Sequence, residues 1–492
     1  MTSKFFITGA TGQLGAFISK ILMEQGHELY LLVRGKNGGQ RIRKIFAKIG
    51  VTSQDYKIIS GDLFGPCPDI NDVDVFLHCA ADLSFDKSDK DRVWHTNLDG
   101  TKNMLNWAGQ MNAKSFQYVS TAYIAGKYKK IFKEQDIDLG QEFNNEYEAS
   151  KMATEKQCHE FCRSHKIPLK IYRPSIVMGT SGGRTLHYKG YYVFLKVIAN
   201  LKAKYIKKED KKVGIFADKG ILHLPIRIEA EDMGRKHLVA LDYVGKAIAA
   251  LSTDKTVSNE TVFLLPDKVP TNYDTLNWTR QALNISDLSL VPFDSLSKTN
   301  CNRLERLLIR YLDIYRPYLK HEPLFDYSYS VNRIQSLGIE PCNIDGNYFK
   351  NLVEYGIQDN WGNVTTKKET HTDNYPYFEE FLPKFLNKEM VPGLSSIKSD
   401  FAVMFEDNQN YFWKLKVVYG KLKQLDYVSS KTKVDFFYKL SLPIFNSIIA
   451  GKRDPRHAFF AGKTNIIGDM EHGLKTATML REFFKLHSYK AE

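Results

Sequence analysis

The sequence predicts an α/β protein in which a doubly wound parallel sheet is followed by a second, smaller α+β domain. Through about residue 180, short apolar stretches typical of strands alternate with amphipathic stretches typical of helices. This alternation indicates a parallel sheet with helices on both faces. A glycine-rich loop lies between the first strand and the first helix. After Tyr375, apolar residues recur at every second position, which indicates half-buried strands of another sheet.

The expected elements follow one another in a regular order. We expect strands at residues 4–10, 27–35, 56–63, 73–81, 116–123 and 167–179, and helices at residues 15–26, 41–50, 97–111 and around 145–156. The pattern loosens from about residue 181 to 292, residues 303–319 are helical again, and strands are expected at 411–419 and 433–442. We therefore expect a first domain at residues 1–292, with its substrate-binding part from about 181, a helical segment at 293–365 and a last domain at 376–492.

The composition is that of a globular protein with an excess of positive charge. Of 492 residues, 43% are hydrophobic and 13% aromatic, and the formal net charge is +13. The lysines and arginines are scattered among apolar segments, without the motifs typical of nucleic-acid-binding proteins. We therefore expect no nucleic acid partner, but rather a phosphorylated cofactor, coenzyme A or an anionic membrane surface. The lysines at 202–212 fit a phosphate-bearing carrier, a membrane surface or a solvated helix face equally well.

The six cysteines form no array typical of disulfides or zinc sites. Cys158 and Cys162 flank His159, but they lie in an amphipathic helix without a second pair of ligands, so we expect ordinary helix residues and no metal. A reduced, cytoplasmic setting follows, with peripheral contact to a membrane surface still open. The first strand begins near Lys4, which leaves no room for a signal peptide, and no run of about 18 apolar residues would span a membrane.

The glycine loop predicts a dinucleotide site. Gly9, Gly12 and Gly15 stand directly between the first strand and the first helix. Glycine permits the tight turn and the close approach of the backbone to a pyrophosphate, which then lies at the helix N-terminus. At the start of an alternating strand–helix pattern, such a triplet predicts a Rossmann-type sheet.

The end of the second strand indicates which dinucleotide binds. An acidic residue there would bind a ribose 2′-hydroxyl and repel a 2′-phosphate, but the chain has Arg34 and Lys36, followed by Arg41 and Arg43. Because a guanidinium pairs well with a phosphate, we predict NADPH. Asp62 and Leu63, after the third strand, are expected near the adenine, and the alternative for Asp62 is a solvated loop residue.

The fifth strand and the helix after it carry the candidate catalytic residues. The strand ends in Ser120 and Thr121, where a parallel strand delivers side chains to the ligand crevice. Tyr147 and Lys151 follow one helical turn apart. A free tyrosine has a pKa of about 10, and we expect the lysine cation to lower it. Thr121 and Tyr147 would then donate to a carbonyl oxygen, while Asn97 would order the helix and a nearby water.

Spacing alone does not single out this tyrosine and lysine. Four other pairs share it, namely Tyr123–Lys127, Tyr192–Lys196, Tyr419–Lys423 and Tyr427–Lys431. The last two fall at the ends of expected tail strands, Tyr192–Lys196 lies beyond the cofactor-binding half, and Tyr123–Lys127 follows immediately on the strand end. The expected catalytic pair is therefore Tyr147–Lys151, which lies at the start of a helix downstream of the strand that ends in Ser120 and Thr121.

The first 250 residues resemble the extended short-chain dehydrogenase/reductase superfamily. The matching motifs are TGATGQLG (Thr8–Gly15), HCAA (His78–Ala81), Asn97, Thr121, Tyr147 with Lys151, and YRPSIVMG (Tyr172–Gly179). The resemblance implies cofactor contacts from these motifs and from the strand ends named above. They are Gly9, Thr11, Gly12, Gln13, Leu14, Gly15, Arg34, Lys36, Arg43, Asp62, Leu63, Ala80, Ala81, Tyr147, Lys151, Pro174 and Ile176.

Further stretches resemble particular branches and a second family. LLVRGKNGGQRIRKI and VSTAYIAG are similar to fatty acyl-CoA reductases and carboxylic thioester reductases. The stretch Ile314–Ile334 resembles a segment of alcohol-forming acyl reductases, although Arg316 stands where that family usually has an acidic residue. GKRDP, AFFAGK and the pair Gly468–Asp469 resemble the sterol-carrier-protein lipid-binding domain, which encloses an apolar tunnel.

Together the resemblances imply an NADPH-dependent reductase of a long-chain acyl thioester, with coenzyme A or acyl carrier protein as the carrier. The product would be an aldehyde, which a second NADPH could reduce to an alcohol. An epimerase, a dehydratase or a hydroxysteroid-type dehydrogenase would share the same cofactor and Tyr/Lys residues. A lipid-binding or transfer protein with an inactive dehydrogenase domain is an alternative of another class.

Overall fold

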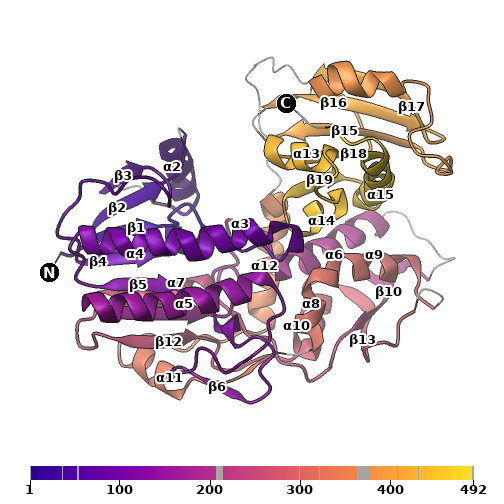
Figure 1. Ribbon diagram of the computed structural model, residues 1–492. Helices are drawn as coiled ribbons and strands as arrows, with labels where there is room; N and C mark the ends of the chain where they lie inside the picture. The colour runs from indigo at the N-terminus through magenta and orange to yellow at the C-terminus, as the bar shows by residue number, and fades with distance from the viewer. Residues whose placement is uncertain are drawn as a thin grey trace. The chain divides into compact units, whose positions relative to one another are not determined.

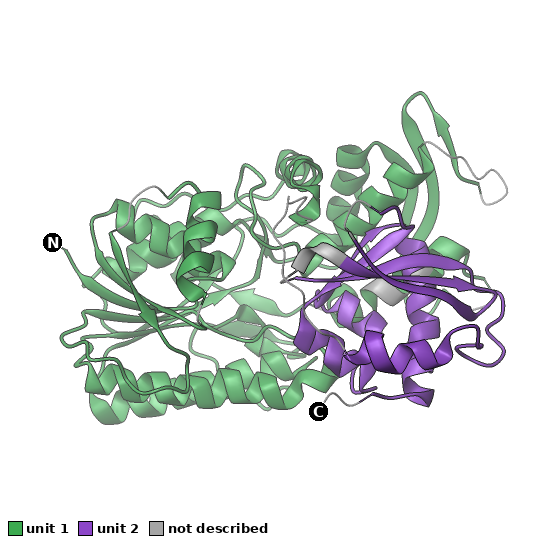
Figure 2. Ribbon diagram, turned by 90° about the horizontal axis from the view of Figure 1, so that it is seen from above, with its two compact units in different colours: residues 1–362 green, residues 363–492 purple. Residues whose placement is uncertain are grey.

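The computed structural model describes residues 2–35, 37–51, 55–206, 214–297, 300–320, 322–362, 376–406, 408–429 and 432–489. The chain forms two compact units, residues 1–362 and 363–492 (Figure 2). The first unit contains a large sheet with helices on both faces, and the second contains a separate sheet with helices. The predicted fold class is thus confirmed.

The large sheet of unit 1 is entirely parallel and has the order β12-β7-β5-β4-β1-β2-β3. Its strands are β1 (Lys4–Thr8), β2 (Glu28–Val33), β3 (Tyr56–Ser60), β4 (Val75–His78), β5 (Phe116–Val119), β7 (Leu169–Pro174) and β12 (Glu260–Leu264). The strand order reverses direction between β1 and β4, so a crevice opens there at the carboxyl ends, as in other doubly wound sheets.

Helices cover both faces of this sheet. On one face α4 and α5 lie side by side (Figure 1), and on the other α1 packs against α7. The bounds are α1 (Gln13–Glu24), α2 (Gly38–Lys48), α3 (Lys90–Trp94), the π-helix η2 (His95–Asp99), α4 (Gly100–Gln110), α5 (Glu146–His165) and α7 (Leu241–Thr253), with short helical turns at η1 (Lys87–Asp89) and η3 (Ala122–Ala125). Cys158 and Cys162 are buried in the apolar core between α5 and the sheet.

An ion pair buried inside unit 1 attaches α5 to the sheet. Arg173 on β7 donates to Glu155 on α5 at 2.6 Å, and both side chains are fully buried. The same guanidinium donates to the Asp136 carbonyl at 2.8 Å, in the loop that precedes α5. Since a buried charge is strongly destabilising without its partner, this pair fixes the position of α5 against β7.

The region from 181 to 292, where the sequence pattern loosens, contains a second small sheet that the sequence analysis missed. Its order is β13-β10-β9, with β9 (Phe216–Asp218), β10 (Ile221–Glu229) and β13 (Ile285–Val291). The register of β10 shifts between His223 and Ile226, next to Pro225, which interrupts the regular pairing. Helices α6 (Tyr191–Tyr205) and α8 (Asn272–Leu283) and the strand pair β8 (Ile176–Val177) with β11 (Leu238–Val239) complete this part.

The segment after residue 293 folds back onto unit 1. It contains α9 (Arg303–Leu312), η5 (Asp313–Tyr315), α10 (Arg316–Lys320), β14 (Leu324–Asp326), α11 (Ser328–Gln335), α12 (Gly346–Gln358) and η6 (Asn360–Gly362). Strand β14 pairs in parallel with β6 (Ile131–Lys133). The expected helical segment therefore has a strand of its own, which attaches it to the loop before α5.

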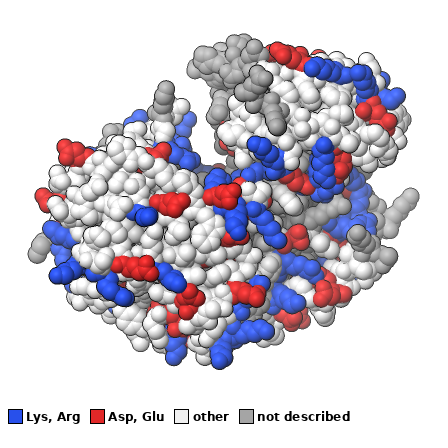
Figure 3. Space-filling view, in the orientation of Figure 1, with Lys and Arg blue, Asp and Glu red and all other residues white. Residues whose placement is uncertain are grey.

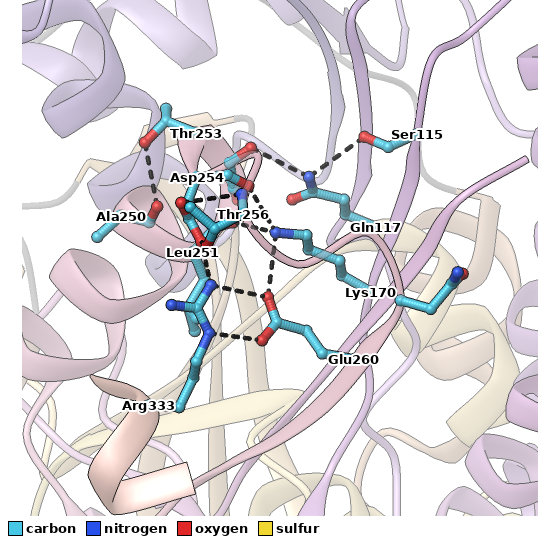
Figure 4. A network of polar contacts seen from close by, with 12 residues as sticks. Ser115, Gln117, Lys170, Ala250, Leu251, Thr253, Asp254, Thr256, Glu260 and Arg333 are labelled. Atoms are coloured by element: carbon cyan, nitrogen blue, oxygen red, sulfur yellow. Dashed lines mark hydrogen bonds and ion pairs between the residues drawn. The ribbon is translucent and has the colours of Figure 1, made fainter. Parts of the chain in front are cut away.

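A buried charge network also joins this segment to the large sheet. Figure 4 shows Glu260, on the edge strand β12, between Lys170 of β7 and Arg333 of α11. The distances are 3.0 Å from Lys170 Nζ and 2.9 Å from Arg333 Nε to the two carboxylate oxygens. Arg333 also pairs with Asp254. The Glu260 carboxylate thus pairs with two cations, and the network connects three elements far apart in the sequence.

Unit 2 is built on a sheet of the order β17-β16-β15-β18-β19. Its elements are η7 (Tyr377–Phe381), η8 (Leu382–Phe385), β15 (Ser399–Phe405), β16 (Asn408–Val418), β17 (Lys421–Ser429), β18 (Phe436–Leu440), α13 (Leu442–Ile449), α14 (Pro455–Phe460), β19 (Thr464–Gly468) and α15 (Met470–Leu486). A cavity of about 50 Å³ lies among apolar side chains that include Phe378, Phe401, Leu415, Tyr438 and Leu480.

The period-two pattern of the tail is confirmed except at its ends. Trp413, Leu415 and Val417 are buried on one face of β16, as predicted. Tyr419, which we expected on the same face, is 58% exposed and has φ +51°, and Gly420 has φ +72°. Two consecutive residues with positive φ are typical of a tight hairpin turn, so the strand ends one residue before the tyrosine.

Charge is distributed without a dominant basic surface on the visible face of unit 1, where Lys and Arg side chains are interspersed with Asp and Glu (Figure 3). Within the described ranges, no helix combines the length and the apolarity needed to cross a membrane.

The network around Glu260 makes a prediction about stability. Glu260→Gln would leave Lys170 buried without its counter-charge, so we expect the free energy of unfolding to fall by about 3–5 kcal/mol. The control is Glu28→Gln, because Glu28 pairs with Lys57 at the surface with 39% and 61% of the two side chains exposed. That change should cost less than about 1 kcal/mol. If urea-induced unfolding showed the same loss of unfolding free energy for Glu260→Gln and Glu28→Gln, the importance of this network would be contradicted.

Candidate active site

The glycine loop at the carboxyl end of β1 has no room for side chains at two positions. Gly9 has φ +76°, and a Cβ atom there would lie 2.6 Å from the Ala80 nitrogen. A Cβ atom on Gly15 would lie 2.4 Å from the Gly9 carbonyl oxygen. The Gly12 amide donates to the same carbonyl at 2.8 Å. The loop thus brings backbone and the N-terminus of α1 close to the crevice, which fits the pyrophosphate of a dinucleotide.

The side chain of Gln13 makes hydrogen bonds to other parts of the protein. Its amide donates to the Met178 carbonyl at 3.0 Å, and its side-chain oxygen accepts from the Thr185 hydroxyl at 2.6 Å and the Leu186 amide at 3.1 Å. The side chain therefore connects the glycine loop to the chain beyond β8. Thr11 and Leu14, on either side in the same loop, are half-buried.

The basic residues after β2 are at the surface. Arg34 and Arg43 are both exposed, and a Cβ atom placed on Gly39 would lie 3.6 Å from the Arg43 guanidinium. Arg41 donates to the Arg34 carbonyl at 2.7 Å, which folds the start of α2 back toward the end of β2. Lys36 lies outside the described residues.

The expected adenine-side and strand-end residues lie in turns after β3 and β4. Asp62 is exposed and accepts from the Phe64 amide at 2.8 Å, in a turn that the carboxylate stabilises. Leu63 is half-buried and packs against Gly100 at the start of α4. Ala80 and Ala81 are also half-buried, and the Ala80 amide donates to the Thr8 hydroxyl at 3.2 Å.

Thr121 and Tyr147 are brought together, as expected from the sequence. Thr121 follows β5, and its hydroxyl donates to the Pro174 carbonyl at the end of β7 at 3.4 Å. Tyr147 lies in the first turn of α5, whose N-cap is Asn145. Burial raises the pKa of Tyr147 above its usual value, while a hydrogen bond with Thr121 opposes that rise. The two hydroxyls are therefore neighbours in a buried environment.

Lys151 does not have the expected effect on Tyr147. Its Nζ donates to the Val119 carbonyl at 2.6 Å and lies 4.1 Å from the centre of the Tyr118 ring. Burial lowers the pKa of Lys151 to about 7, whereas the pKa of Tyr147 is raised. The prediction that the lysine cation lowers the tyrosine pKa is thus wrong, because burial and the nearby Glu148 raise the pKa of Tyr147.

Asn97 connects two parts of the site. It is buried in the π-helix η2, accepts from the Asp82 amide at 2.7 Å and donates to the Ser150 hydroxyl at 2.9 Å. It thus fastens the loop after β4 to α5, next to Lys151. Ile176, half-buried in β8, donates its amide to the His237 carbonyl at 3.0 Å.

An aromatic cluster that the sequence analysis did not assign to the site contacts Tyr147 through Phe85. The ring of Phe85 lies 5.8 Å from that of Tyr147, 6.0 Å from Tyr315 and 5.7 Å from Tyr318. We call Phe85, Tyr315 and Tyr318 the aromatic wall. Tyr315 and Tyr318 lie in the stretch 314–334 that resembles acyl reductases, which was a usable signal, whereas nothing in the local sequence distinguishes Phe85.

A second tyrosine–lysine pair also opens a helix. Tyr192 and Lys196 lie in the first turns of α6 and both are buried. Burial lowers the pKa of Lys196 to about 8. Helical spacing and a buried lysine are therefore common to both pairs, and the contact with Thr121 distinguishes Tyr147.

A parallel sheet of this topology, with a glycine loop after β1 and a Tyr–Lys helix after β5, has the architecture of a dinucleotide-binding fold. Residues 7–248 match the family described as Male sterility protein, and residues 395–481 match the SCP-2 sterol transfer family. Two separate stretches of the chain are therefore similar to these two families.

Two curated relatives are fatty acyl-CoA reductases. The alcohol-forming fatty acyl-CoA reductase of Simmondsia chinensis is 25% identical over 232 residues, which cover 40% of this chain and 47% of that protein. Fatty acyl-CoA reductase 1 of Gallus gallus is 31% identical over 150 residues, which cover 25% and 29%. The chain thus spans less than half the length of these relatives.

A similar solved structure is the terminal R domain from the myxalamid PKS-NRPS biosynthetic pathway. The TM-score is 0.59 with 21% sequence identity, and the match covers 73% of this chain and 92% of that domain. At this identity the likeness concerns the fold.

Lys151 makes a prediction about the pH dependence of stability. In the folded protein its pKa is about 7, below the value of about 10.4 for an unfolded lysine. Between these values the unfolded chain binds more protons, so stability rises with pH by about 1.4 kcal/mol per pH unit. Lys151→Met should remove this rise in the unliganded protein, as measured by urea-induced unfolding from pH 7 to 10.

The control for this measurement is Lys102→Met, which replaces an exposed lysine on α4. It should leave the pH dependence of the wild type unchanged. If Lys151→Met and the wild type have parallel stability profiles, the lysine is charged in the folded protein and its burial has been overestimated.

Proposed function

We propose that the protein reduces a long-chain acyl thioester with NADPH to an aldehyde, and that a second reduction takes the aldehyde to the alcohol. The observation that carries this proposal is the aromatic wall over Tyr147. Phe85 packs against the half-buried Tyr147, and Tyr315 and Tyr318 pack against Phe85. This arrangement gives an apolar surface next to a hydroxyl donor, as a reducible carbonyl on a hydrophobic chain requires. The fatty acyl-CoA reductases among the relatives support the same substrate class.

Thr121 and Tyr147 are the proposed donors to the reacting carbonyl oxygen. The cofactor, when bound, supplies a hydride to the thioester carbon. Negative charge then develops on the oxygen, and two hydroxyls in a buried site stabilise it. Removing one such donor typically costs about 3 kcal/mol of transition-state stabilisation. When the carbon–sulfur bond breaks, its electron pair leaves with the thiolate, which is a tolerable leaving group because a thiol has a pKa of about 8.5.

In the second reduction the oxygen needs a proton, and Tyr147 is the proposed donor. A tyrosine whose pKa is raised by burial is fully protonated near neutral pH, as a general acid must be. Lys151, with a pKa of about 7, can change its protonation state in the same range. We assign it the restoration of the Tyr147 proton, with Asn97 positioning the helix that carries both.

The glycine loop and the exposed guanidiniums support NADPH as the cofactor. Gly9, Gly12 and Gly15 leave backbone space for the pyrophosphate, and Arg34 and Arg43 offer cations to a 2′-phosphate after β2. The half-buried Ala80 and Ala81 would flank the dinucleotide, together with Asp62, Leu63, Pro174 and Ile176. Lys36 remains a predicted contact.

Unit 2 supports a lipid as substrate or product. Its cavity is lined by aromatic and aliphatic side chains, and the match to the SCP-2 sterol transfer family covers the same unit. We propose residues 376–492 as the lipid-binding domain, residues 1–292 as the cofactor- and substrate-binding domain and residues 293–365 as a segment that completes the latter. The sterol named in that family's description favours a second candidate, a sterol dehydrogenase on the same site.

The first functional test follows oxidation of NADPH with long-chain acyl-CoA. The wild type should oxidise the cofactor, and Tyr147→Phe should abolish turnover while NADPH binding stays intact. Tyr192→Phe is the matched control, because that tyrosine has the same spacing to a buried lysine and lies on α6, outside the proposed donor pair. It should keep wild-type turnover. Turnover of a hydroxysteroid but of no acyl thioester would instead establish the second candidate.

The second test concerns cofactor preference. Arg34→Asp should weaken NADPH relative to NADH by about tenfold or more, since it removes a charge-assisted hydrogen bond and adds repulsion. Lys44→Asp makes the same charge change at an exposed position on α2 and should leave the preference nearly unchanged. The kcat/KM ratio for the two cofactors measures the effect. An unchanged ratio in Arg34→Asp would place the phosphate elsewhere.

A further inference from the structure

Two buried polar side chains in the segment 316–326 contact both turns that carry the proposed hydroxyl donors. They are Tyr318, in α10, and Glu322, between α10 and β14. Neither belongs to the sheet that binds the cofactor, and both lie beyond residue 248, where the match to the Male sterility family ends.

Tyr318 fastens the first turn of α5. Its hydroxyl donates to Glu148 Oε1 at 2.5 Å and accepts from Asn145 Nδ2 at 2.7 Å. Asn145 is the N-cap of α5, and its side chain in turn accepts from the Glu148 amide at 3.1 Å. The hydroxyl of Tyr318 therefore bridges the residues on either side of the turn that presents Tyr147.

Glu322 fastens the turn after β5. Its carboxylate accepts from the Tyr123 hydroxyl at 2.8 Å, and the Tyr123 amide donates to the Thr121 hydroxyl oxygen at 3.2 Å. Lys236 at 3.1 Å and His237 at 3.0 Å surround the same carboxylate. Burial alone would raise the pKa of Glu322, but Lys236, His237 and Tyr123 lower it to about 2, so the carboxylate is charged at neutral pH.

The two contacts act as one unit. Lys236, which pairs with Glu322, also donates to the Tyr318 carbonyl. The rings of Tyr123 and Tyr318 pack edge to face with centres 5.3 Å apart. Buried polar groups are expensive unless fully hydrogen-bonded, and apolar residues of similar size often stabilise a core as well. Apolar side chains at these positions would be enough for stability. The hydrogen bonds of Tyr318 and Glu322 therefore serve to fix the positions of the two turns that they contact.

We propose that Tyr318 and Glu322 are positioning residues that set the separation between the Thr121 and Tyr147 hydroxyls. The inference rests on the proposed function of those two hydroxyls as donors to one oxygen. The segment 316–326 holds each of the two turns through a hydrogen bond to a flanking residue, and its own two contacts are joined through Lys236. The donor pair is complete only when this segment has folded onto it.

The test removes single hydroxyls and keeps the rings. Tyr318→Phe retains the aromatic wall, so the KM for acyl-CoA and the affinity for NADPH should stay within about twofold, whereas kcat should fall about 10- to 100-fold, the loss expected for small misplacement of donors. Tyr123→Phe should lower kcat similarly and leaves Glu322 paired with Lys236 and His237. We choose Tyr123→Phe in preference to Glu322→Gln, because Glu322→Gln would leave Lys236 buried without a counter-charge.

The matched control is Tyr329→Phe. This tyrosine also donates to a carboxylate, Glu260, at 3.2 Å, and it also follows residue 293, but it contacts neither donor turn. Its replacement should leave kcat unchanged. If Tyr329→Phe lowers kcat as much as Tyr318→Phe does, the effect is general destabilisation and the positioning role is overturned.

Amide hydrogen exchange provides a readout that needs no turnover. Tyr318→Phe should speed exchange at residues 146–150 and Tyr123→Phe at residues 121–125, each without changing exchange in β1 or α1. Wild-type exchange at these positions would overturn the inference. Failure of the wild type to reduce any acyl thioester would refute the proposed function alone, because the exchange measurement would still decide whether the segment holds the two turns.

Discussion

The geometry of the candidate site depends on the buried ion pair between Arg173 and Glu155. Helix α5 carries Tyr147 and Lys151 but contributes no hydrogen bonds to the sheet ladder, so side chains must hold it in register with β5. Arg173 does this from β7: its Nη2 donates to the Glu155 carboxylate at 2.6 Å and to the Asp136 carbonyl at 2.8 Å, and its Nη1 donates to the Glu134 carbonyl at 3.1 Å. Because an unpaired charge in that position would be strongly unfavourable, small displacements of α5 are opposed electrostatically as well as by packing.

The parts of the fold that depend on local pattern could be predicted from the sequence. The alternation of strand and helix, the glycine loop and the meeting of Thr121 with Tyr147 all follow from short stretches and from the geometry of parallel strands. The sheet of β10 and β13 was missed although Leu222, Leu224, Ile226 and Ile228 alternate regularly with less buried residues along β10. Pro225 in the middle of this run is unusual for a central strand, which argues against the pattern when only the sequence is read. The pKa shifts of Lys151 and Tyr147 were misjudged because both result mainly from burial, which no short stretch of sequence reveals.

The residues that sequence reasoning did not assign to the site share one property, which is a long separation along the chain. Phe85 meets Tyr318, and Glu322 meets Tyr123, across about two hundred residues. The strand β14, the ion pairs of Arg333 and the contacts of Tyr318 all bring residues 313–335 against elements formed before residue 265. The helical segment is thus an integral part of unit 1, and a match that ends at residue 248 omits the edge strand β12 of the main sheet.

The side chain of Gln13 joins the glycine-rich turn to residues 178–186. It stands in the glycine loop, yet its oxygen accepts from Thr185 and Leu186 and its amide donates to Met178. Any rearrangement of the loop that accompanies cofactor binding must therefore either carry residues 185–186 along or break these hydrogen bonds. Coupling free energies between two sites are reciprocal. If a dinucleotide at the glycine-rich turn changed the affinity of residues 185–186 for a second ligand, that ligand would change the affinity for the dinucleotide by the same factor. Gln13 is the side chain through which such a coupling would pass.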